Sequence, residues 1–240
     1  MQSVWIVLTV VFMLWVAWHV GKGERKAGPA PRPVYPVEKR RLFQHLRWRR
    51  EDAGRFGEFL LMELISRRLE PGRFAMLHDT WLHVRRGGTT QIDCIVVTEG
   101  AVFVVEAKYW DCLVDGSPEA ERWRFVYGRK VVYDGNPRLQ NQGHIADLRE
   151  NFGWNVDWNL RSIVAYADKT RFARPLPPDV MHFSEVPDYI ERIAAQRRGD
   201  PLDVAAVAAA IRRKSDAVTP EERAAHVENL HKRGERLRNL

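Results

Sequence analysis

Cysteine is scarce in this 240-residue chain, which contains only two, Cys94 and Cys112. Neither belongs to a CxxC pair, so the sequence lacks the ligand spacing of a structural zinc site and has no disulfide framework. No GxxxxGK[ST] phosphate loop occurs either, which argues against an ATP-driven motor. The composition is that of a cytosolic domain, and a hydrolase that needs only a metal ion and water remains open.

Charge of either sign is absent from Ser3 to Val20, a run of eighteen residues. At the rise of an α-helix this run reaches roughly 27 Å, close to the hydrocarbon thickness of a bilayer. No Lys or Arg precedes the run and no small-x-small cleavage site follows it, which argues against a signal peptide. Residues 1–21 are therefore predicted to form a retained transmembrane anchor.

Positive charge follows this run. Residues 21–55 contain eleven Lys or Arg and four Asp or Glu, a surplus of seven that equals the formal net charge of the whole chain. Because positive residues stay on the cytoplasmic side, we expect a single-pass protein whose large domain is cytoplasmic.

Residues 22–51 are predicted to be a Pro-rich and basic juxtamembrane linker. Its basic run, Lys39 to Arg41 and Arg47 to Arg50 with Trp48, has two interpretations. It sets membrane topology and contacts anionic lipid, or it binds a nucleic-acid backbone.

A β-hairpin is predicted over residues 91–97 and 101–109, because both runs are rich in Val, Ile and Phe and a Gly-containing turn separates them. Side chains alternate across a strand, so Glu106 and Lys108 should share one face, and Asp93 interrupts the partner strand similarly. Two carboxylates suit Mg²⁺ or Mn²⁺, and an adjacent lysine can act on the attacking water or stabilise charge on a phosphate. The alternative is a surface hairpin whose polar face is ordinary solvated charge.

Two helices flank this hairpin in the sequence. Apolar residues at helical spacing predict an amphipathic helix over residues 51–69 that contains Glu58. Asn136-Pro137 predicts the start of a second helix that runs to about Asn151, with Gln140 and His144 on one face.

These elements together resemble the nuclease-related domain (NERD) family of the PD-(D/E)XK nuclease-like superfamily. The resemblance covers about residues 52–155 and rests on the order and spacing of short motifs, which are Gly57-Glu58, Gln91-Ile92-Asp93, Gly100 through Glu106-Ala107-Lys108, and Asn136-Pro137 with Gln140-Asn141. It implies an α/β, restriction-endonuclease-like mixed sheet flanked by helices. The sequence departs from the family at Cys94, where a histidine is frequent, and at residues 109–112, where a glycine-containing segment is frequent.

The resemblance also implies a set of site residues. Asp93 and Glu106 would bind Mg²⁺ or Mn²⁺, and Glu58 would complete the acidic site. Lys108 would serve the water and the transition state, and Gln140 would contribute from the later helix.

The remaining elements complete the predicted organisation. Residues 162–166 read as the last core strand, and the nuclease-like domain is expected to extend over residues 52–196. Residues 197–240 are rich in alanine and charge and predict a helical tail, which either packs on the domain or contacts a partner.

The sequence thus predicts a membrane-anchored, metal-dependent nuclease that hydrolyses phosphodiester bonds in DNA. The alternative is a non-catalytic module of the same fold that binds nucleic acid or a protein partner at the membrane. Filled positions at all five site residues argue for the enzyme.

Overall fold

The computed structural model describes residues 50–238, except residues 86, 154 and 198. The predicted anchor, nearly all of the linker and the basic run within it lie outside the described residues. Within the described part of the chain, no helix combines the length and the apolar character that crossing a membrane requires.

Along the described chain, α3 precedes the strands β1 to β6, α4 separates these from β7 to β9, and the remaining helices follow. The strands are β1 (Phe74–His83), β2 (Thr89–Thr98), β3 (Val102–Lys108), β4 (Leu113–Asp115), β5 (Arg122–Tyr127), β6 (Lys130–Gly135), β7 (Leu160–Tyr166), β8 (Arg171–Phe172) and β9 (Val180–His182). The helices are α3 (Arg50–Arg68), α4 (Pro137–Phe152), the 3₁₀ turn η1 (Phe183–Glu185), α5 (Val186–Ala194), α6 (Val204–Asp216) and α7 (Pro220–Arg238).

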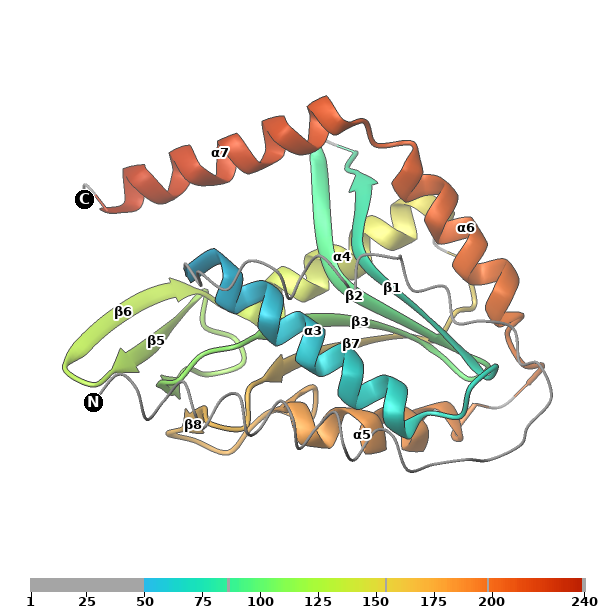
Figure 1. Cartoon of the computed structure of the whole chain (residues 1–240), viewed down its shortest axis with the longest axis horizontal. Coiled ribbons are helices and arrows are strands. Elements are labelled where there is room, and N and C mark those ends of the chain that lie inside the picture. The colour runs from blue at the N-terminus through green and yellow to red at the C-terminus, as the bar shows by residue number, and fades with distance from the viewer. Residues whose placement is uncertain (1–49, 86, 154, 198, 239–240) are drawn as a thin grey trace, which may run out of the picture. The chain divides into compact units, whose positions relative to one another are not determined.

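A mixed sheet forms the centre of the domain, with strand order β1-β2-β3-β7-β9. β2 pairs antiparallel with both β1 and β3, whereas β7 lies parallel to β3 and β9 lies parallel to β7. The parallel β3–β7 pair requires a crossover, and α4 lies within that connection (Figure 1).

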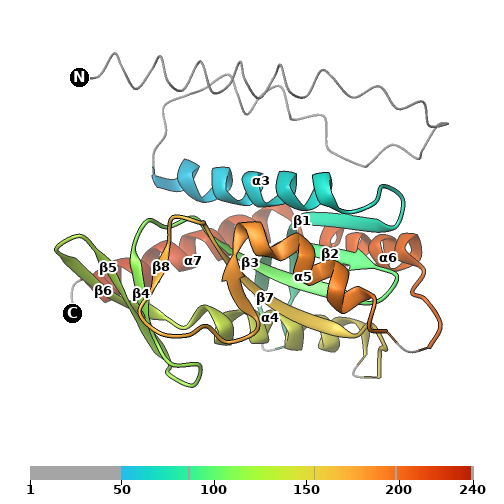
Figure 2. The ribbon, with the colours of Figure 1, turned by 90° about the horizontal axis from the view of Figure 1, so that it is seen from below.

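Helices cover both faces of this sheet (Figures 1 and 2). On one face, Leu61 and Ile65 of α3 and Ile190 of α5 pack against Phe103 and Val105 of β3. On the other face, the buried residues are Leu77, Leu82, Ile92, Ile95, Val97, Val102, Val104, Leu148, Val207, Ala208 and Ile211. The alternating apolar residues of β3 therefore fill two separate cores, which fixes the faces of its polar residues.

A second sheet has the order β6-β5-β4-β8 and extends from the chain that leaves β3. One of its faces is buried through Val114, Trp123 and Phe125 against Tyr166 and Val180 of the main sheet. The main sheet and the second sheet thus share a third core cluster, next to the end of β3.

The structure confirms a mixed α/β fold with a mixed sheet and flanking helices. It also confirms the predicted hairpin and the helix that Asn136 caps, where the Asn136 side chain accepts a hydrogen bond from the backbone N–H of Arg138 at 2.9 Å. The prediction that residues 162–166 form the last core strand is wrong, because β9 follows and pairs with β7. Three prolines precede β9, and a strand of three residues is too short to display an alternating pattern in the sequence.

Candidate active site

A reversal of the pleat positions Asp93. On one side of Asp79 and Asp93, the paired residues Leu77 and Ile95 face the core beneath α4 and α6. On the other side, Leu82 and Ile92 face the same core, although each lies an odd number of residues from its counterpart and should face the opposite way in a regular strand. Asp79 lies at the reversal with a positive φ of 50°. Because Asp tolerates this left-handed conformation better than most residues, the kink can form without glycine.

The kink separates β2 from β3 where Asp93 would otherwise pair with Glu106. The recorded ladder between the two strands stops at the pair Cys94–Val105. Beyond this pair, a side chain bonds to β3 in place of the backbone. Oδ2 of Asp93 accepts a hydrogen bond from the backbone N–H of Ala107 at 2.9 Å. This bond fixes the carboxylate beside the Glu106-Ala107-Lys108 segment.

Glu106 and Lys108 lie on the face of β3 that the alternation predicted. Glu106 is 2% exposed, and its Oε1 accepts a hydrogen bond from Lys108 Nζ at 2.5 Å. The Lys108 ammonium also lies 5.3 Å from the centre of the Trp110 ring. The alternative of an ordinary solvated hairpin face is therefore wrong, because Glu106 is buried and the Lys108 side chain is only 16% exposed.

Glu58 approaches the same place from α3. Gly57 allows this approach, since a Cβ atom at Gly57 would lie 2.2 Å from the Cβ of Tyr109 at the end of β3. Burial, followed by repulsion from Asp79 and Glu106, raises the pKa of Glu58. The helix thus brings a third carboxylate near Asp93 and Glu106.

The electrostatics of this acidic cluster are unbalanced. Burial, followed by the Glu106 charge, raises the pKa of Asp93 to about 8. Burial also opposes ionisation of Glu106, but Lys108 and His144 outweigh it and lower the pKa of Glu106 to about 2. One ammonium therefore neutralises one carboxylate, while further negative charge at Asp93 and Glu58 is disfavoured.

Lys108 remains protonated in this setting. Burial favours its neutral form, but the Glu106 and Asp93 carboxylates outweigh burial and raise the pKa of Lys108. The side chain thus carries a partly buried positive charge and is not a neutral amine.

α4 supplies a second group of polar side chains behind Glu106. Asn141 is fully buried, and its Nδ2 donates to the backbone carbonyl of Val104 at 2.8 Å and to the carbonyl of Ile163 at 3.1 Å. One turn later His144 Nε2 lies 3.6 Å from Glu106 Oε2. The buried stripe of α4 therefore contains Asn141 and His144.

Gln140 lies beside this stripe and is exposed. No hydrogen bond from its side chain is recorded within the described residues. Its predicted catalytic role stays a prediction, whereas Glu58, Asp93, Glu106 and Lys108 are brought together.

Sequence reasoning missed Asp79 as a member of this neighbourhood. Its Oδ1 accepts hydrogen bonds from Trp81 Nε1 at 2.8 Å and from Gln91 Nε2 at 2.7 Å. Gln91 of the Gln-Ile-Asp motif therefore contacts Asp79 and supports the kink. No repeating sequence pattern predicts the role of Asp79, because that role depends on the positive φ of this single residue.

No three His, Cys, Asp or Glu side chains within the described residues form a ready-made metal cage. Mg²⁺ does not require one, because it commonly binds to one or two carboxylates and completes its shell with water and phosphate oxygens. Glu106 Oε2 is buried without a hydrogen-bond partner, and Asp93 resists carrying an uncompensated charge. A hard divalent cation fits this donor set.

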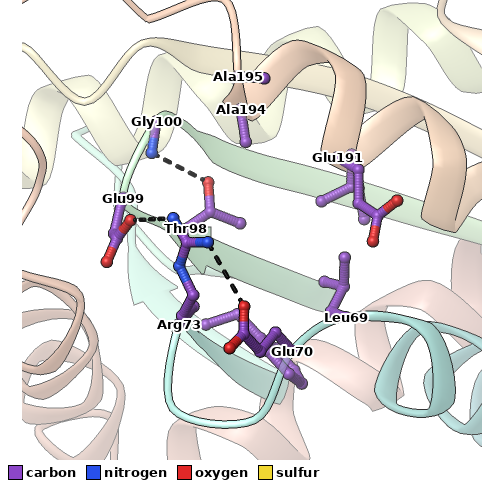
Figure 3. A pocket seen from close by; sticks show the side chains of 11 residues that line it. Leu69, Glu70, Arg73, Thr98, Glu99, Gly100, Glu191, Ala194 and Ala195 are labelled. Atoms are coloured by element: carbon purple, nitrogen blue, oxygen red, sulfur yellow. Dashed lines mark hydrogen bonds and ion pairs between the residues drawn. The ribbon is translucent and has the colours of Figure 1, made fainter.

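A pocket of about 300 Å³ lies at the opposite end of β3, where α3 ends and α5 passes the β2–β3 turn (Figure 3). Arg73 in this pocket contacts Glu99 at 2.7 Å and Glu70 at 3.4 Å. The pocket contains none of the clustered acids and lysine, so it is not the candidate active site.

Comparisons with known proteins give a family match and a relative in sequence. Residues 53–167 match the sequence model of a family described as the nuclease-related domain. A segment of 110 residues is 40% identical to an uncharacterized protein of Bacillus anthracis and covers 46% of this chain and 50% of that protein. The chain thus spans about half the length of this curated relative. No solved structure matches.

Proposed function

We propose, from the match of residues 53–167 to the nuclease-related domain family, that the protein is a metal-dependent nuclease that hydrolyses phosphodiester bonds in DNA. The observation that carries the proposal is the convergence of Asp93, Glu106 and Lys108 at the kinked end of the β2–β3 pair. Nuclease domains of the PD-(D/E)XK type generally use divalent metals, which agrees with the donor set described above.

Asp93 and Glu106 would hold Mg²⁺ or Mn²⁺ in this proposal. Both carboxylates are fixed before any ion binds, Asp93 by the Ala107 N–H and Glu106 by Lys108. A bound divalent cation supplies a Lewis acid for the phosphate and lowers the pKa of a coordinated water. Glu58 is the third acidic group of the proposed site, because its charge interacts with that of Glu106.

Lys108 acts on the phosphate side of the reaction. Hydrolysis forms a bond between a water oxygen and phosphorus while the bond to one ester oxygen breaks, and negative charge accumulates on the phosphoryl oxygens. Because the pKa of Lys108 is raised, the residue is a cation that stabilises this charge and orients the water. We assign Gln140 a contact to the substrate from the exposed first turn of α4.

The test uses the full-length chain, purified in mild detergent, with single- and double-stranded DNA and RNA in Mg²⁺, Mn²⁺ or EDTA. We expect cleavage that needs metal and is lost in Lys108→Ala and Asp93→Asn. Arg213→Gln on the exposed side of α6 is the matched control and should cleave normally. Cleavage that persists in Asp93→Asn would overturn the assignment. A folded wild type that binds but cleaves nothing would favour the non-catalytic module.

We further propose that the uncharged run from Ser3 to Val20 anchors the protein in a membrane, with residues 50–238 in the cytoplasm. The surplus of positive charge in residues 21–55 supports this orientation and suits contact with anionic lipid. Full-length protein should stay with membranes after alkaline carbonate extraction. Release by carbonate would refute a spanning segment.

A further inference from the structure

The second sheet collects arginines that are dispersed in the sequence. Residues 56–240 carry no net formal charge, so the composition does not predict a basic surface outside residues 21–55. The pairing registers nevertheless align Leu113 with Arg171, Asp115 with Arg124, and Arg124 with Tyr133. Side chains of paired residues lie on the same face of a sheet. Arg124, Arg171 and Tyr133 therefore share one face, which we call the arginine face.

Alternation along the strands completes this face. Arg122 lies two residues before Arg124 on β5, and Arg174 follows β8 and contacts Asp115 Oδ1 at 2.6 Å. The opposite face of β5 carries Trp123 and Phe125, which are buried in the core. The arginine face thus contains Arg122, Arg124, Arg171 and Arg174 with Asp115 as the acidic residue among them.

Exposed apolar side chains lie among these charges. Tyr133 is 57% exposed and Val131 is 44% exposed, and both belong to the edge strand β6. Arginines around an exposed aromatic ring match a nucleic-acid strand, because the guanidinium groups meet phosphates while the ring stacks on a base.

The acidic cluster lies toward the opposite, buried face of the second sheet, and β6 is the edge strand that borders both faces. Asp134, the residue after Tyr133, interacts with the charge of Lys108. On the inner side of β5, the Phe125 ring packs 4.8 Å from the ring of Trp110, over which Lys108 lies. Figure 2 shows β4, β5, β6 and β8 side by side in this part of the domain.

We propose that the arginine face binds a single-stranded segment of nucleic acid, with phosphates on Arg122, Arg171 and Arg174 and a base stacked on Tyr133. A base inside a duplex does not offer its ring face, so stacking on Tyr133 selects single strands or opened ends. The inference rests on the proposed nuclease function only for the statement that the bound strand is cleaved. It makes single-stranded nucleic acid the substrate class.

The experiment measures binding without cleavage. Full-length protein in EDTA is titrated against fluorescein-labelled oligo(dT), oligo(rU) and a DNA duplex of equal length, and fluorescence anisotropy reports the Kd. We expect wild type to bind single strands at least fivefold more tightly than duplex. Tyr133→Ser should weaken single-strand binding at least fivefold, and Tyr133→Phe should retain it. The oligo(dT) and oligo(rU) titrations distinguish DNA from RNA.

The charge variant is Arg171→Gln with Arg174→Gln, and its control is Arg212→Gln with Arg213→Gln on the exposed side of α6. We expect the first pair to reduce the slope of log K against log salt by roughly 1.4, about 0.7 for each lost charge, and the control pair to leave it unchanged.

Several results would overturn the inference. These are no binding by wild type, preference for duplex, or equal binding by both arginine pairs. Loss of binding to phosphatidylserine vesicles in the Arg171/Arg174 variant, with oligonucleotide binding intact, would assign the face to a lipid surface instead. Binding that responds to these variants without any metal-dependent cleavage would defeat the proposed function and leave the inference standing. Cleavage with unaltered binding in the variants would do the reverse.

Discussion

Nε2 of His144 lies 3.6 Å from Oε2 of Glu106, and neither atom has a hydrogen-bond partner within the described residues. The other ring nitrogen, Nδ1, is 3.0 Å from the hydroxyl of Thr90. His144 is therefore held from behind by β2 and faces the oxygen of Glu106 that remains available to a metal ion. This arrangement makes His144 a positioning residue for Glu106.

We predict that His144→Leu lowers kcat about 10- to 100-fold and raises the Mg²⁺ concentration needed for half-maximal activity, because Glu106 loses its orientation. His144→Gln should recover part of the loss, since an amide nitrogen can reach the position of Nε2. Metal titrations at saturating substrate check this. Equal activity of the leucine variant and wild type at limiting Mg²⁺ would contradict the role.

The helix that carries His144 gives a second prediction through its neighbours Gln140 and Asn141. Asn141→Ala should lower the free energy of unfolding by about 3 kcal/mol, because the carbonyls of Val104 and Ile163 lose a buried donor. Gln140→Ala should change stability by less than about 0.5 kcal/mol, because Gln140 is exposed. Urea unfolding measures both variants.

Activity separates the same two residues. If Gln140 contacts substrate, Gln140→Ala raises KM or lowers kcat while the protein keeps wild-type stability. A fully active Gln140→Ala would remove Gln140 from the site, and the assignments of Asp93, Glu106 and Lys108 would be unaffected.

Local patterns were sufficient for part of this molecule. The hairpin, the Asn136 cap and the shared face of Glu106 and Lys108 follow from periods of two and 3.6 residues and from capping chemistry, all of which are local. They were predictable because neighbouring residues determine them.

Other features of the site could not be predicted from the sequence, because they depend on contacts between residues far apart in the chain. The kink at Asp79 depends on a single positive φ, and the contact between His144 and Glu106 joins a helix to a strand nearly forty residues away. The arginine face depends on three strand registers, and a shift of one residue in any of them would disperse it. None of these relationships produces a repeating pattern of residues in the sequence.

Gly57 gives a third prediction, which concerns the packing of α3 against β3. Gly57→Ala places a methyl group 2.2 Å from the Cβ of Tyr109, so the helix must shift and Glu58 with it. We expect a loss of about 2 kcal/mol in stability together with lower activity. Gly54→Ala is the control in the same helix, because a Cβ there meets nothing within 4 Å.

Helix propensity alone should make Gly54→Ala more stable by up to about 1 kcal/mol. Thermal unfolding of both variants and wild type tests the pair. If Gly57→Ala were stabilised as much as Gly54→Ala, the close contact between α3 and Tyr109 would be refuted.

The raised pKa of Asp93 gives a fourth prediction, on stability and pH. With a folded-state pKa of about 8 and an ordinary value of 3.8, Asp93 binds its proton more tightly in the folded protein. Its contribution is therefore most favourable below pH 4 and is lost as pH rises toward 8. Asp93→Asn removes this penalty, and in EDTA at pH 8 it should be more stable than wild type by about 1 to 3 kcal/mol, less than full burial would give.

Urea unfolding in EDTA between pH 5 and pH 8.5 measures this difference, which should grow with pH and then level off. Glu106→Gln is the opposite case, because the pKa of Glu106 is lowered to about 2 by Lys108 and His144. The ionised Glu106 stabilises the fold above pH 4.5, so its loss should destabilise the protein throughout this range. Mg²⁺ should raise the stability of wild type at pH 8 and leave Asp93→Asn nearly unchanged, since the ion relieves the repulsion that the substitution has already removed. Parallel pH curves for wild type and Asp93→Asn would mean that Asp93 is solvated like an ordinary aspartate and is not poised to receive a cation.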